Sequence, residues 1–309
     1  MINWQRYTAM FKRLELPPTD LTGQHILISG GNDGIGLEAA IHLARTNAQI
    51  TIASRNAQKS KQAVEKIIKL TGNAQIDYEV LDLSCYASVK AFTSRFKSKN
   101  TKLDCLINNS GVVNHQFKLS EDGIEQTLQV NYLSPILLTL SLLPLLKKSE
   151  NPRIVMTSSD LHLDTTLELP KDLESNEKDY VGMYAYAKSK LMSAIVARTL
   201  AVKLLSQGIS TYSVHPGFVK TDIGKHDLPD TLFYQSFGYF YRFLQNLYGR
   251  KGEQGGISTA YMAVGKDLEN GGYYDSCEKA LENPQTSDEK LGEELWKETL
   301  RLIGVNESD

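Results

Sequence analysis

The sequence predicts an α/β protein built on one doubly wound parallel sheet of about seven strands, with helices on both faces. Two observations carry this prediction. Short apolar segments rich in Ile, Val, Leu and Thr recur without clean alternation of polar residues, which is typical of strands buried on both faces. Longer segments with helical periodicity separate them, and this strand–helix–strand rhythm favours a parallel sheet covered on both sides.

Each element follows from this alternation. The apolar segments predict strands at 25–29, 49–53, 76–81, 103–108, 153–158 and 209–215. The periodic segments predict helices at 35–47, 57–70, 86–98, 121–148 and 181–206. Because crossovers between parallel strands are right-handed, a doubly wound order is the leading topology. We see neither a linker nor an internal repeat, so residues 1–309 are expected to form a single domain.

Composition narrows the function classes. The chain has 309 residues, of which 41% are hydrophobic and 23% charged, and its formal net charge is −2. Such values indicate a globular protein, and the balanced charge offers no basic face for nucleic acid. Cys85, Cys105 and Cys277 have neither metal-ligand nor disulfide spacing. We therefore expect no metal site and a reducing compartment.

The ends of the chain bear on membranes. The N-terminal extension, residues 1–20, has no long apolar run, so neither a signal peptide nor a transmembrane helix is expected there, and the predicted location is cytoplasmic. Apolar residues at helical spacing near the start predict a docked helix, or alternatively a helix on a membrane surface. The longest apolar stretch, 136–146, is too short to span a bilayer and predicts a buried core helix.

Two segments interrupt the rhythm of strands and helices. Residues 160–180 are acidic and irregular, and they predict an exposed surface loop. Residues 225–252 are crowded with aromatic side chains and predict a helical insertion with one apolar face.

A glycine-rich turn follows the first predicted strand and leads into a helix. Its candidate ligand-binding residues are Ser29, Gly30, Asn32, Gly34, Ile35 and Gly36. Glycines let the backbone approach a pyrophosphate closely, and the helix N-terminus offers unpaired N–H groups to its charge. The turn therefore predicts a Rossmann-type dinucleotide site, although a tight turn that binds nothing remains the alternative.

The choice of dinucleotide depends on the end of the second strand. An acidic residue there would bind the ribose diol of NAD, but this chain has Ser54 and Arg55. A guanidinium suits a 2′-phosphate and a serine can add a hydrogen bond, so NADP(H) is predicted over NAD(H). Asp82, after the third strand, either contacts the adenine or caps the helix that begins near Tyr86.

Several motifs together resemble the short-chain dehydrogenase/reductase family. They are the glycine motif, Asn108-Asn109-Ser110-Gly111, a serine after the fifth strand, a Tyr-x-x-x-Lys helix, and Pro216-Gly217. The match runs from about residue 22 to 222. The tail resembles the retinol dehydrogenase-like subgroup through Gly255–Ala263, Gly271–Asp275 and a helix from Asp288 to Gly304. Ser29 replaces the usual threonine and Ser110 the usual alanine.

Two tyrosine–lysine pairs satisfy the family spacing. Tyr184 with Lys188 and Tyr186 with Lys190 both place their side chains on one helix face. The family has a serine before the lysine and an apolar residue after it, and Ser189-Lys190-Leu191 fits this pattern. The resemblance therefore assigns Tyr186 and Lys190, and leaves the other pair as surface or substrate-loop residues.

The resemblance implies a catalytic set of Asn131, Ser159, Tyr186 and Lys190. A lysine cation favours the phenolate, so Tyr186 could pass a proton to or from the substrate oxygen. Lys190 would also hold the nicotinamide ribose, and Ser159, the second of two serines, would polarise the substrate oxygen. Asn131 would support a proton-relaying water, with a stabilised helix kink as its alternative role.

The remaining coenzyme contacts are carried over from the same resemblance. They are Asp82, Leu83, Asn109, Ser110, Gly111, Tyr186, Lys190, Pro216, Gly217, Val219 and Thr221. Thr221 would contact the carboxamide, and the pro-S hydride would be transferred. Among the histidines, His215 is expected to be structural, whereas His162 either lines the substrate pocket or is structural.

The sequence thus predicts an NADP(H)-dependent oxidoreductase of an aldehyde or ketone, or of the corresponding alcohol. Segment 225–252 falls where the family places its substrate-covering segment, which favours a lipophilic substrate such as a retinoid, steroid, fatty aldehyde or polyketide. Alternatives are a non-catalytic NADP-binding regulator, a peripheral membrane protein anchored through 225–252, and a sugar-nucleotide epimerase. A homodimer is the expected assembly.

Overall fold

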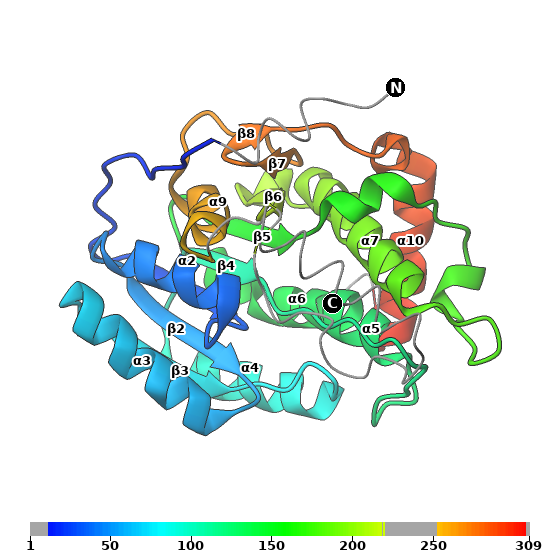
Figure 1. The fold of residues 1–309 in the computed structure, drawn as a ribbon, viewed down its shortest axis with the longest axis horizontal. Coiled ribbons are helices and arrows are strands. Elements are labelled where there is room, and N and C mark those ends of the chain that lie inside the picture. Colours follow the sequence, from blue (N-terminus) through cyan, green and yellow to red (C-terminus); the bar gives the residue numbers. More distant parts are fainter. Residues whose placement is uncertain (1–11, 218, 220–251, 307–309) are drawn as a thin grey trace, which may run out of the picture.

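The computed structural model describes residues 12–217, 219 and 252–306, and Figure 1 shows their arrangement around one sheet. The strands are β1 (His25–Ser29), β2 (Gln49–Ser54), β3 (Ile76–Val80), β4 (Cys105–Asn108), β5 (Arg153–Thr157), β6 (Ser210–His215), β7 (Tyr273–Asp275) and β8 (Glu278–Lys279). Their order is β3-β2-β1-β4-β5-β6-β7-β8, and every neighbouring pair is parallel except β7 with β8. The predicted doubly wound parallel sheet is confirmed.

The sheet has eight strands where about seven were predicted. The additional strand, β8, is a two-residue edge strand that folds back from β7. The turn between them contains Ser276 and Cys277 with φ of 56° and 64°. A left-handed pair of non-glycine residues has no clear sequence signature, so this small hairpin was not predicted.

Two helical layers cover the sheet. One face carries α2 (Gly34–Ala44), α3 (Ala57–Thr71) and α9 (Gly252–Val264), and the other carries α4 (Tyr86–Lys99), α6 (Ser134–Leu146), α7 (Gly182–Lys203) and α10 (Glu289–Ile303). In Figure 1 α2 and α3 lie beside the blue strand β2, α9 lies beside α2 and close to β5 and β6, and α7 and α10 lie together at the right. Each layer buries its own apolar cluster against the sheet.

Local sequence explains where the helices begin and end. Asn56 accepts a hydrogen bond from Lys59 N at the start of α3, and Asp288 accepts one from Leu291 N at the start of α10. Gly72 and Gly304 end these two helices with φ of 73° and 66°, values that favour glycine.

The helix predicted at 121–148 is interrupted. It consists of a short α5 (Gln126–Leu128), a five-residue π-helix over Gln129–Leu133, and α6. The combined helical run Gln126–Leu146 is long and apolar enough to cross a membrane, but 78% of its most apolar window is buried inside the molecule. The prediction of a buried core helix at 136–146 is therefore confirmed.

Residues 160–180 form the largely exposed segment that their acidity suggested, but part of it is anchored to the body. Two 3-10 turns, Asp160–Asp164 and Lys171–Leu173, shape the segment, and Leu167 and Leu173 are buried. Gln285 from the C-terminal part of the chain exchanges two hydrogen bonds with the backbone of Leu167, of 2.7 and 2.9 Å. A partner 118 residues away thus holds the segment against the body.

The N-terminal extension is described only from residue 12 onward. Leu14 is buried, and its backbone N–H and C=O both bind the side chain of Gln254 in α9. The predicted N-terminal helix lies largely outside the described residues, as does the 225–252 insertion apart from Gly252, the first residue of α9.

Candidate active site

The candidate residues gather at the carboxyl ends of the parallel strands. The strand order reverses between β1 and β4, and sheets of this topology bind ligands at the carboxyl ends of the strands beside such a reversal, a place called the crevice below. The glycine turn follows β1, Asn109 to Gly111 follow β4, and Ser159 follows β5. Helix α7, which supplies the tyrosine and lysine, packs across the same end.

Close packing explains the glycines of the first turn. Gly30 has a φ of 69°, and a Cβ there would lie 2.8 Å from Ser110 Oγ. A Cβ on Gly36 would lie 2.3 Å from Gly30 O, so only glycine allows α2 to approach the turn. Gly34 has a φ of 52° and its Cβ position points into open space. This open space lies before the N-terminus of α2, where an anion would be stabilised.

Ser29 and Asn109 build the turn from inside. The Ser29 hydroxyl accepts hydrogen bonds from the N–H groups of Asn109 and Ser110, of 3.0 and 3.2 Å. The Asn109 amide donates to the carbonyls of Ser29 and Gly30, at 3.2 and 3.3 Å. These two side chains tie β1 to β4 and fix the turn, while Asn32 and Ile35 lie half-buried at its rim.

At the end of β2 the two predicted phosphate ligands differ. Ser60 Oγ donates its proton to Asn56 O, so Ser54 Oγ donates to Ser60 Oγ at 2.7 Å. Ser54 is buried and its proton is directed into the protein. Arg55 is exposed, and it is therefore the donor that the end of β2 offers to a ligand.

Asp82 shapes the turn before α4. Its carboxylate accepts hydrogen bonds from the N–H and hydroxyl of Ser84, of 2.9 and 2.7 Å. The first helical N–H, that of Tyr86, instead binds Asp122 at 2.7 Å. Asp82 thus holds the turn rather than capping α4 directly. Leu83 beside it is buried in the core, where its carbonyl accepts from Ser134 Oγ.

Helix α7 separates the two tyrosine–lysine pairs. The side chain of Tyr186 is 9% exposed and that of Lys190 is 2% exposed, whereas Tyr184 is 62% exposed. Lys188 is engaged elsewhere, in a partly buried ion pair with Asp172. Lys190 Nζ lies 5.5 Å from the centroid of the Tyr186 ring. The structure therefore brings Tyr186 and Lys190 to the crevice and leaves Tyr184 and Lys188 outside it.

Lys190 is held by the end of β5. Its Nζ donates a 2.8 Å hydrogen bond to Thr157 O, and a Cβ on Gly111 would lie 3.3 Å from it. Burial lowers the pKa of Lys190 to about 8, because a low-dielectric environment disfavours the cation. The same geometry that hides the ammonium places it between the tyrosine and the loop after β4.

Asn131 lies at the centre of the π-helix. Its side chain donates to Val112 O at 2.9 Å, accepts from Val112 N at 2.8 Å, and donates to Ser189 Oγ at 3.0 Å. Ser189 in turn donates to Tyr186 O at 2.7 Å. The amide therefore joins the loop after β4 to the catalytic turn of α7, and the helix irregularity expected as its alternative role is present.

The two serines after β5 have different surroundings. Ser158 is buried and donates to Lys190 O at 2.8 Å, so it fixes α7 against the sheet. Ser159 Oγ accepts from Leu161 N at 3.3 Å and donates to Asp160 Oδ1 at 3.4 Å, both long contacts. The less firmly held hydroxyl of Ser159 is thus the one that can turn toward a substrate oxygen.

The histidines have structural surroundings. His162 is fully buried, with Nδ1 2.6 Å from Ser159 O and Nε2 accepting from Asn283 N at 3.4 Å. Its ring also packs 4.4 Å from that of Tyr273, which assigns it a structural role rather than a place in the pocket. His215 is buried at the end of β6, with Nε2 3.9 Å from Asp160 Oδ1.

The loop after β6 is described only in part. Pro216 and Gly217 follow the strand, and Gly217 has a φ of 91°. Val219 is buried, and a Cβ on Gly255 in α9 would lie 2.4 Å from its Cγ2. Thr221 lies outside the described residues.

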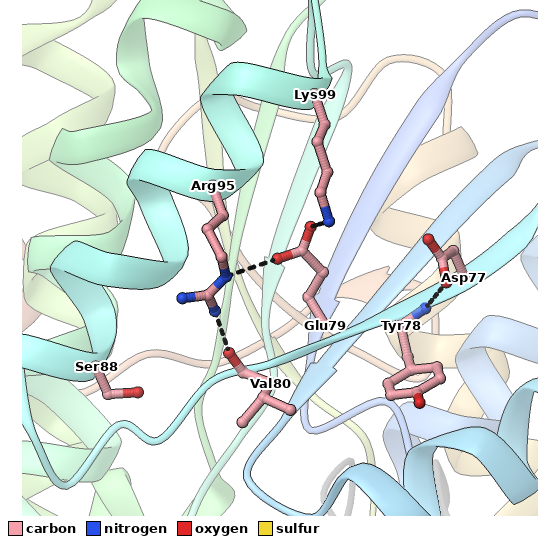
Figure 2. Close-up of a pocket in the computed structure, with 7 residues that line it drawn as sticks. All are labelled: Asp77, Tyr78, Glu79, Val80, Ser88, Arg95 and Lys99. Atoms are coloured by element: carbon pink, nitrogen blue, oxygen red, sulfur yellow. Dashed lines mark hydrogen bonds and ion pairs between the residues drawn. The ribbon is translucent and has the colours of Figure 1, made fainter.

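A separate hollow of about 640 Å³ lies at the other edge of the sheet, between β3 and α4 (Figure 2). The buried carboxylate of Glu79 pairs there with Lys99 at 2.9 Å and with Arg95 at 3.5 Å. Arg95 also donates to Val80 O, and Asp77 accepts from Tyr78 N. These contacts occupy outward-facing backbone groups of the edge strand and protect it from pairing with another chain.

The donor set at the carboxyl edge fits a nicotinamide dinucleotide. The open space before α2 suits a pyrophosphate, Arg55 suits a 2′-phosphate, and the buried Lys190 is placed to reach a ribose. Two residues here were not predicted. Asp33 is the N-cap of α2, and Thr157 accepts from Lys190 through its main chain. Asp33 could have been found from the sequence, because an aspartate directly before a helix is a typical N-cap. Thr157 could not, because a main-chain carbonyl acceptor has no sequence signal.

Comparisons with known proteins agree with this geometry. A family model described as short chain dehydrogenase matches residues 24–170. Retinol dehydrogenase 12 of Mus musculus is 34% identical over 287 residues, which cover 92% of this chain and 88% of that protein. Retinol dehydrogenase 11 of Homo sapiens is 33% identical, covering 92% and 87%. The WW domain-containing oxidoreductase of Gallus gallus is 32% identical, covering 97% and 73%.

Solved structures share the fold. An uncharacterised protein from Mycobacterium Paratuberculosis superposes with a TM-score of 0.74 at 24% identity, covering 93% of this chain and 96% of that one. A short chain dehydrogenase from Shigella flexneri, complexed with NADP, superposes with a TM-score of 0.63 at 23% identity, covering 84% and 99%.

Proposed function

The chain belongs to the short-chain dehydrogenase family, and from this premise we propose that it is an NADP(H)-dependent oxidoreductase of a lipophilic aldehyde or ketone, or of the corresponding alcohol. Membership makes it an oxidoreductase that acts on CH–OH or C=O groups with a nicotinamide coenzyme. The observation that carries the proposal is the buried Tyr186–Lys190 pair, whose ammonium group lies between the end of β5 and the loop after β4.

In the proposed reaction the protein moves the proton. The Tyr186 hydroxyl donates a proton to the carbonyl oxygen during reduction and takes one from the alcohol in the reverse direction. The Lys190 cation stabilises the phenolate that results, and Ser159 donates a hydrogen bond to the same substrate oxygen. A bound nicotinamide coenzyme supplies or accepts the hydride. Asn131 keeps the loop after β4 and the catalytic turn of α7 in register.

The preference for NADP(H) rests on Arg55. An exposed guanidinium at the end of β2 attracts a 2′-phosphate. Positions 54 and 55 hold Ser and Arg, so neither carries the acidic side chain that would bind the ribose diol of NAD. We expect Arg55→Ala to weaken NADPH binding about tenfold and to leave NADH binding nearly unchanged, as measured by nucleotide fluorescence titration. Lys61→Ala, which removes another exposed cation from α3, is the matched control. Equal losses for both nucleotides would contradict this assignment.

The lipophilic substrate is supported by apolar side chains beside the catalytic turn. Met183 stands three residues before Tyr186 and seven before Lys190, so all three share one face of α7. Met183 and Val181, two residues before it, are 39% and 47% exposed, so both offer apolar surface to a substrate near the start of α7. The relatives named retinol dehydrogenases support the same substrate class. The substrate-covering role of 225–252 remains part of the proposal.

The decisive experiment is a turnover assay. Purified protein is supplied with NADPH or NADH and with carbonyls that range from small aldehydes to retinal, steroid ketones and long-chain aldehydes. We expect NADPH-dependent turnover of the lipophilic compounds, retention of turnover in Tyr184→Phe, and its loss in Tyr186→Phe with NADPH binding intact. Preference for small polar carbonyls would overturn the substrate class. Substantial activity of Tyr186→Phe would overturn the catalytic assignment.

We also propose a cytoplasmic location with peripheral membrane contact, and a homodimer. Among the described residues, Cys85 and Cys105 carry free thiols, which supports a reducing compartment. Flotation of the protein with liposomes, with and without residues 225–252, tests the membrane contact. Sedimentation analysis tests the dimer, and a single monomeric species at micromolar concentration would exclude it.

A further inference from the structure

We propose that Tyr180 is a positioning residue that clamps the loop after β4 onto the starts of two helices, α5 and α7, and so fixes one wall of the substrate site. The expected effect of the clamp on KM rests on the proposed function, whereas the clamp itself does not. It concerns a residue six positions before the catalytic tyrosine, outside the motifs that identify the family.

The clamp is a hydrogen-bond node built around one hydroxyl. Tyr180 Oη lies 2.9 Å from Asn114 O, 3.0 Å from Glu125 Oε1 and 3.2 Å from Thr127 Oγ1. Asn114 belongs to the loop after β4, and Thr127 belongs to α5. A single side chain therefore touches three residues in two segments, the loop after β4 and the start of α5, which are 53 to 66 residues away from it in the sequence.

The donors and acceptors of this node balance. Glu125 is buried, and its two carboxylate oxygens accept from Thr127 N at 2.8 Å and Leu128 N at 2.7 Å, so it caps α5. The Thr127 hydroxyl then donates to Tyr180 Oη, which shares its own proton between Asn114 O and Glu125 Oε1. Burial raises the pKa of Tyr180, so the phenol keeps this proton at neutral pH.

Packing reinforces the hydrogen bonds. Phe117 belongs to the loop after β4, and its ring packs edge to face against the Tyr180 ring with centroids 5.5 Å apart. A Cβ on Gly182, the first residue of α7, would lie 2.1 Å from Asn114 O and 2.8 Å from His115 Cα. The loop backbone is therefore pressed directly against the start of the catalytic helix, at a contact that only glycine permits.

The clamp is one of several anchors on the loop, where Asn114 Nδ2 also donates to Gln126 Oε1 at 3.2 Å, and two of these anchors flank Val113. Asn131 grips Val112 through both backbone groups, and Gly111 beside it faces Lys190 Nζ. Tyr180 grips Asn114 two residues later. Val113 lies half-buried between the two anchors, at the carboxyl edge where ligands bind in sheets of this topology. The position of this stretch relative to Tyr186 therefore depends on the Tyr180 hydroxyl.

Tyr180→Phe tests the clamp, because it keeps the ring against Phe117 and removes only the hydroxyl. Tyr78→Phe is the matched control, since Tyr78 is half-buried at the β3 edge, far from the node. Hydrogen–deuterium exchange measures the loop directly. We expect faster exchange of peptides covering 112–118 and 181–185 in Tyr180→Phe, with other peptides unchanged, and no change in Tyr78→Phe. Unchanged or uniformly faster exchange in Tyr180→Phe would overturn the clamp.

The kinetic arm uses retinal with saturating NADPH. We expect KM for retinal to rise about tenfold in Tyr180→Phe, as for one lost buried hydrogen bond, with NADPH affinity kept and kcat changed less. A merely structural role would lower the melting temperature without this selective rise in KM, and that result would overturn the positioning role. Should the wild-type protein fail to turn over retinal or any other carbonyl, the proposed function fails while hydrogen exchange still decides the clamp.

Discussion

The ammonium group of Lys190 lies 5.5 Å from the centroid of the Tyr186 ring and is almost completely buried. Its main-chain acceptor, Thr157 O, is neutral, and among the described residues no carboxylate is paired with this cation to offset the cost of its burial. The consequence is a pKa lowered by burial to about 8, close to the pH at which an enzyme works.

This pKa predicts that the rate of carbonyl reduction falls on the alkaline side of the pH profile. Lys190 is a cation below about pH 8 and becomes neutral above it, so its support for the Tyr186 phenolate is lost as the pH rises. We expect kcat/KM for carbonyl reduction to fall tenfold per pH unit above that value, measured with saturating NADPH. In Lys190→Arg, whose charge does not titrate in this range, the normalised profile should stay flat to about pH 10. A flat wild-type profile between pH 7 and 9.5 would contradict the assignment.

The fold was predictable because its strands are buried on both faces. Continuous apolar segments such as 25–29 and 153–158 announce such strands, and their bounds agree with β1 and β5 to within one residue. Residues 121–148 were predicted as one continuous helix. The π-helix over Gln129–Leu133 was missed because it keeps the apolar character of its neighbours. The π-helix is associated with hydrogen bonds from Asn131 to Val112 and Ser189, and such contacts between distant segments cannot be predicted from the local sequence.

The candidate site was predictable where spacing along one helix decides it. Tyr184 and Tyr186 both satisfy that spacing, and burial against the sheet, a property of the tertiary structure, separates them. Roles that depend on distant partners were not predictable. The surroundings of His162 are set by Asn283, and those of Tyr180 by Asn114 and Glu125, all more than 50 residues away.

Asp33 predicts a way to strengthen coenzyme binding. Its exposed carboxylate accepts from Gly34 N at 2.8 Å, at the helix terminus where the pyrophosphate would lie. The charge repels phosphate and the hydrogen bond occupies an N–H group that could bind it. Asp33→Ser keeps a capping oxygen and removes the charge, so we expect NADPH to bind about threefold to tenfold more tightly at low salt.

Fluorescence titration of NADPH measures this effect, and its decrease with added salt identifies it as electrostatic. Asp288→Ser makes the same substitution at the N-cap of α10, far from the site, and should leave NADPH affinity unchanged. Weaker binding by Asp33→Ser would show that the carboxylate orders the turn rather than opposing the phosphate.

Met183 predicts a change in substrate preference. On the proposed function, a long apolar substrate at Tyr186 would contact the face of α7 on which Met183 is exposed. Removing this contact with Met183→Ser should lower kcat/KM for a long-chain aldehyde about tenfold, as for about 50 Å² of lost apolar contact, and leave a small aldehyde unaffected. Val202→Ser alters an exposed apolar residue about 28 Å farther along the same helix and is the control. Equal effects on both aldehydes would exclude a role in specificity.

His25 predicts how the fold responds to acid. The side chain is buried at the start of β1, where Nε2 lies 2.9 Å from Thr51 Oγ1, and burial lowers its pKa from 6.5 to about 4. Between these two values the unfolded chain binds a proton that the folded chain does not, so stability falls as the pH falls through this window. The loss attributable to His25 is about 3 kcal/mol by pH 4.

Urea unfolding at pH 7 and at pH 4.5 measures this loss as a change in the free energy of unfolding. His42, whose pKa burial also lowers, loses stability in the same direction, so the wild-type slope contains more than the contribution of His25. His25→Gln replaces the ring with a polar side chain that does not titrate, and we expect its stability to depend less on pH even where it is lower throughout. A variant slope equal to that of the wild-type protein would mean that His25 becomes protonated without unfolding, with Asp104, which binds its backbone N–H at 2.8 Å, compensating the charge.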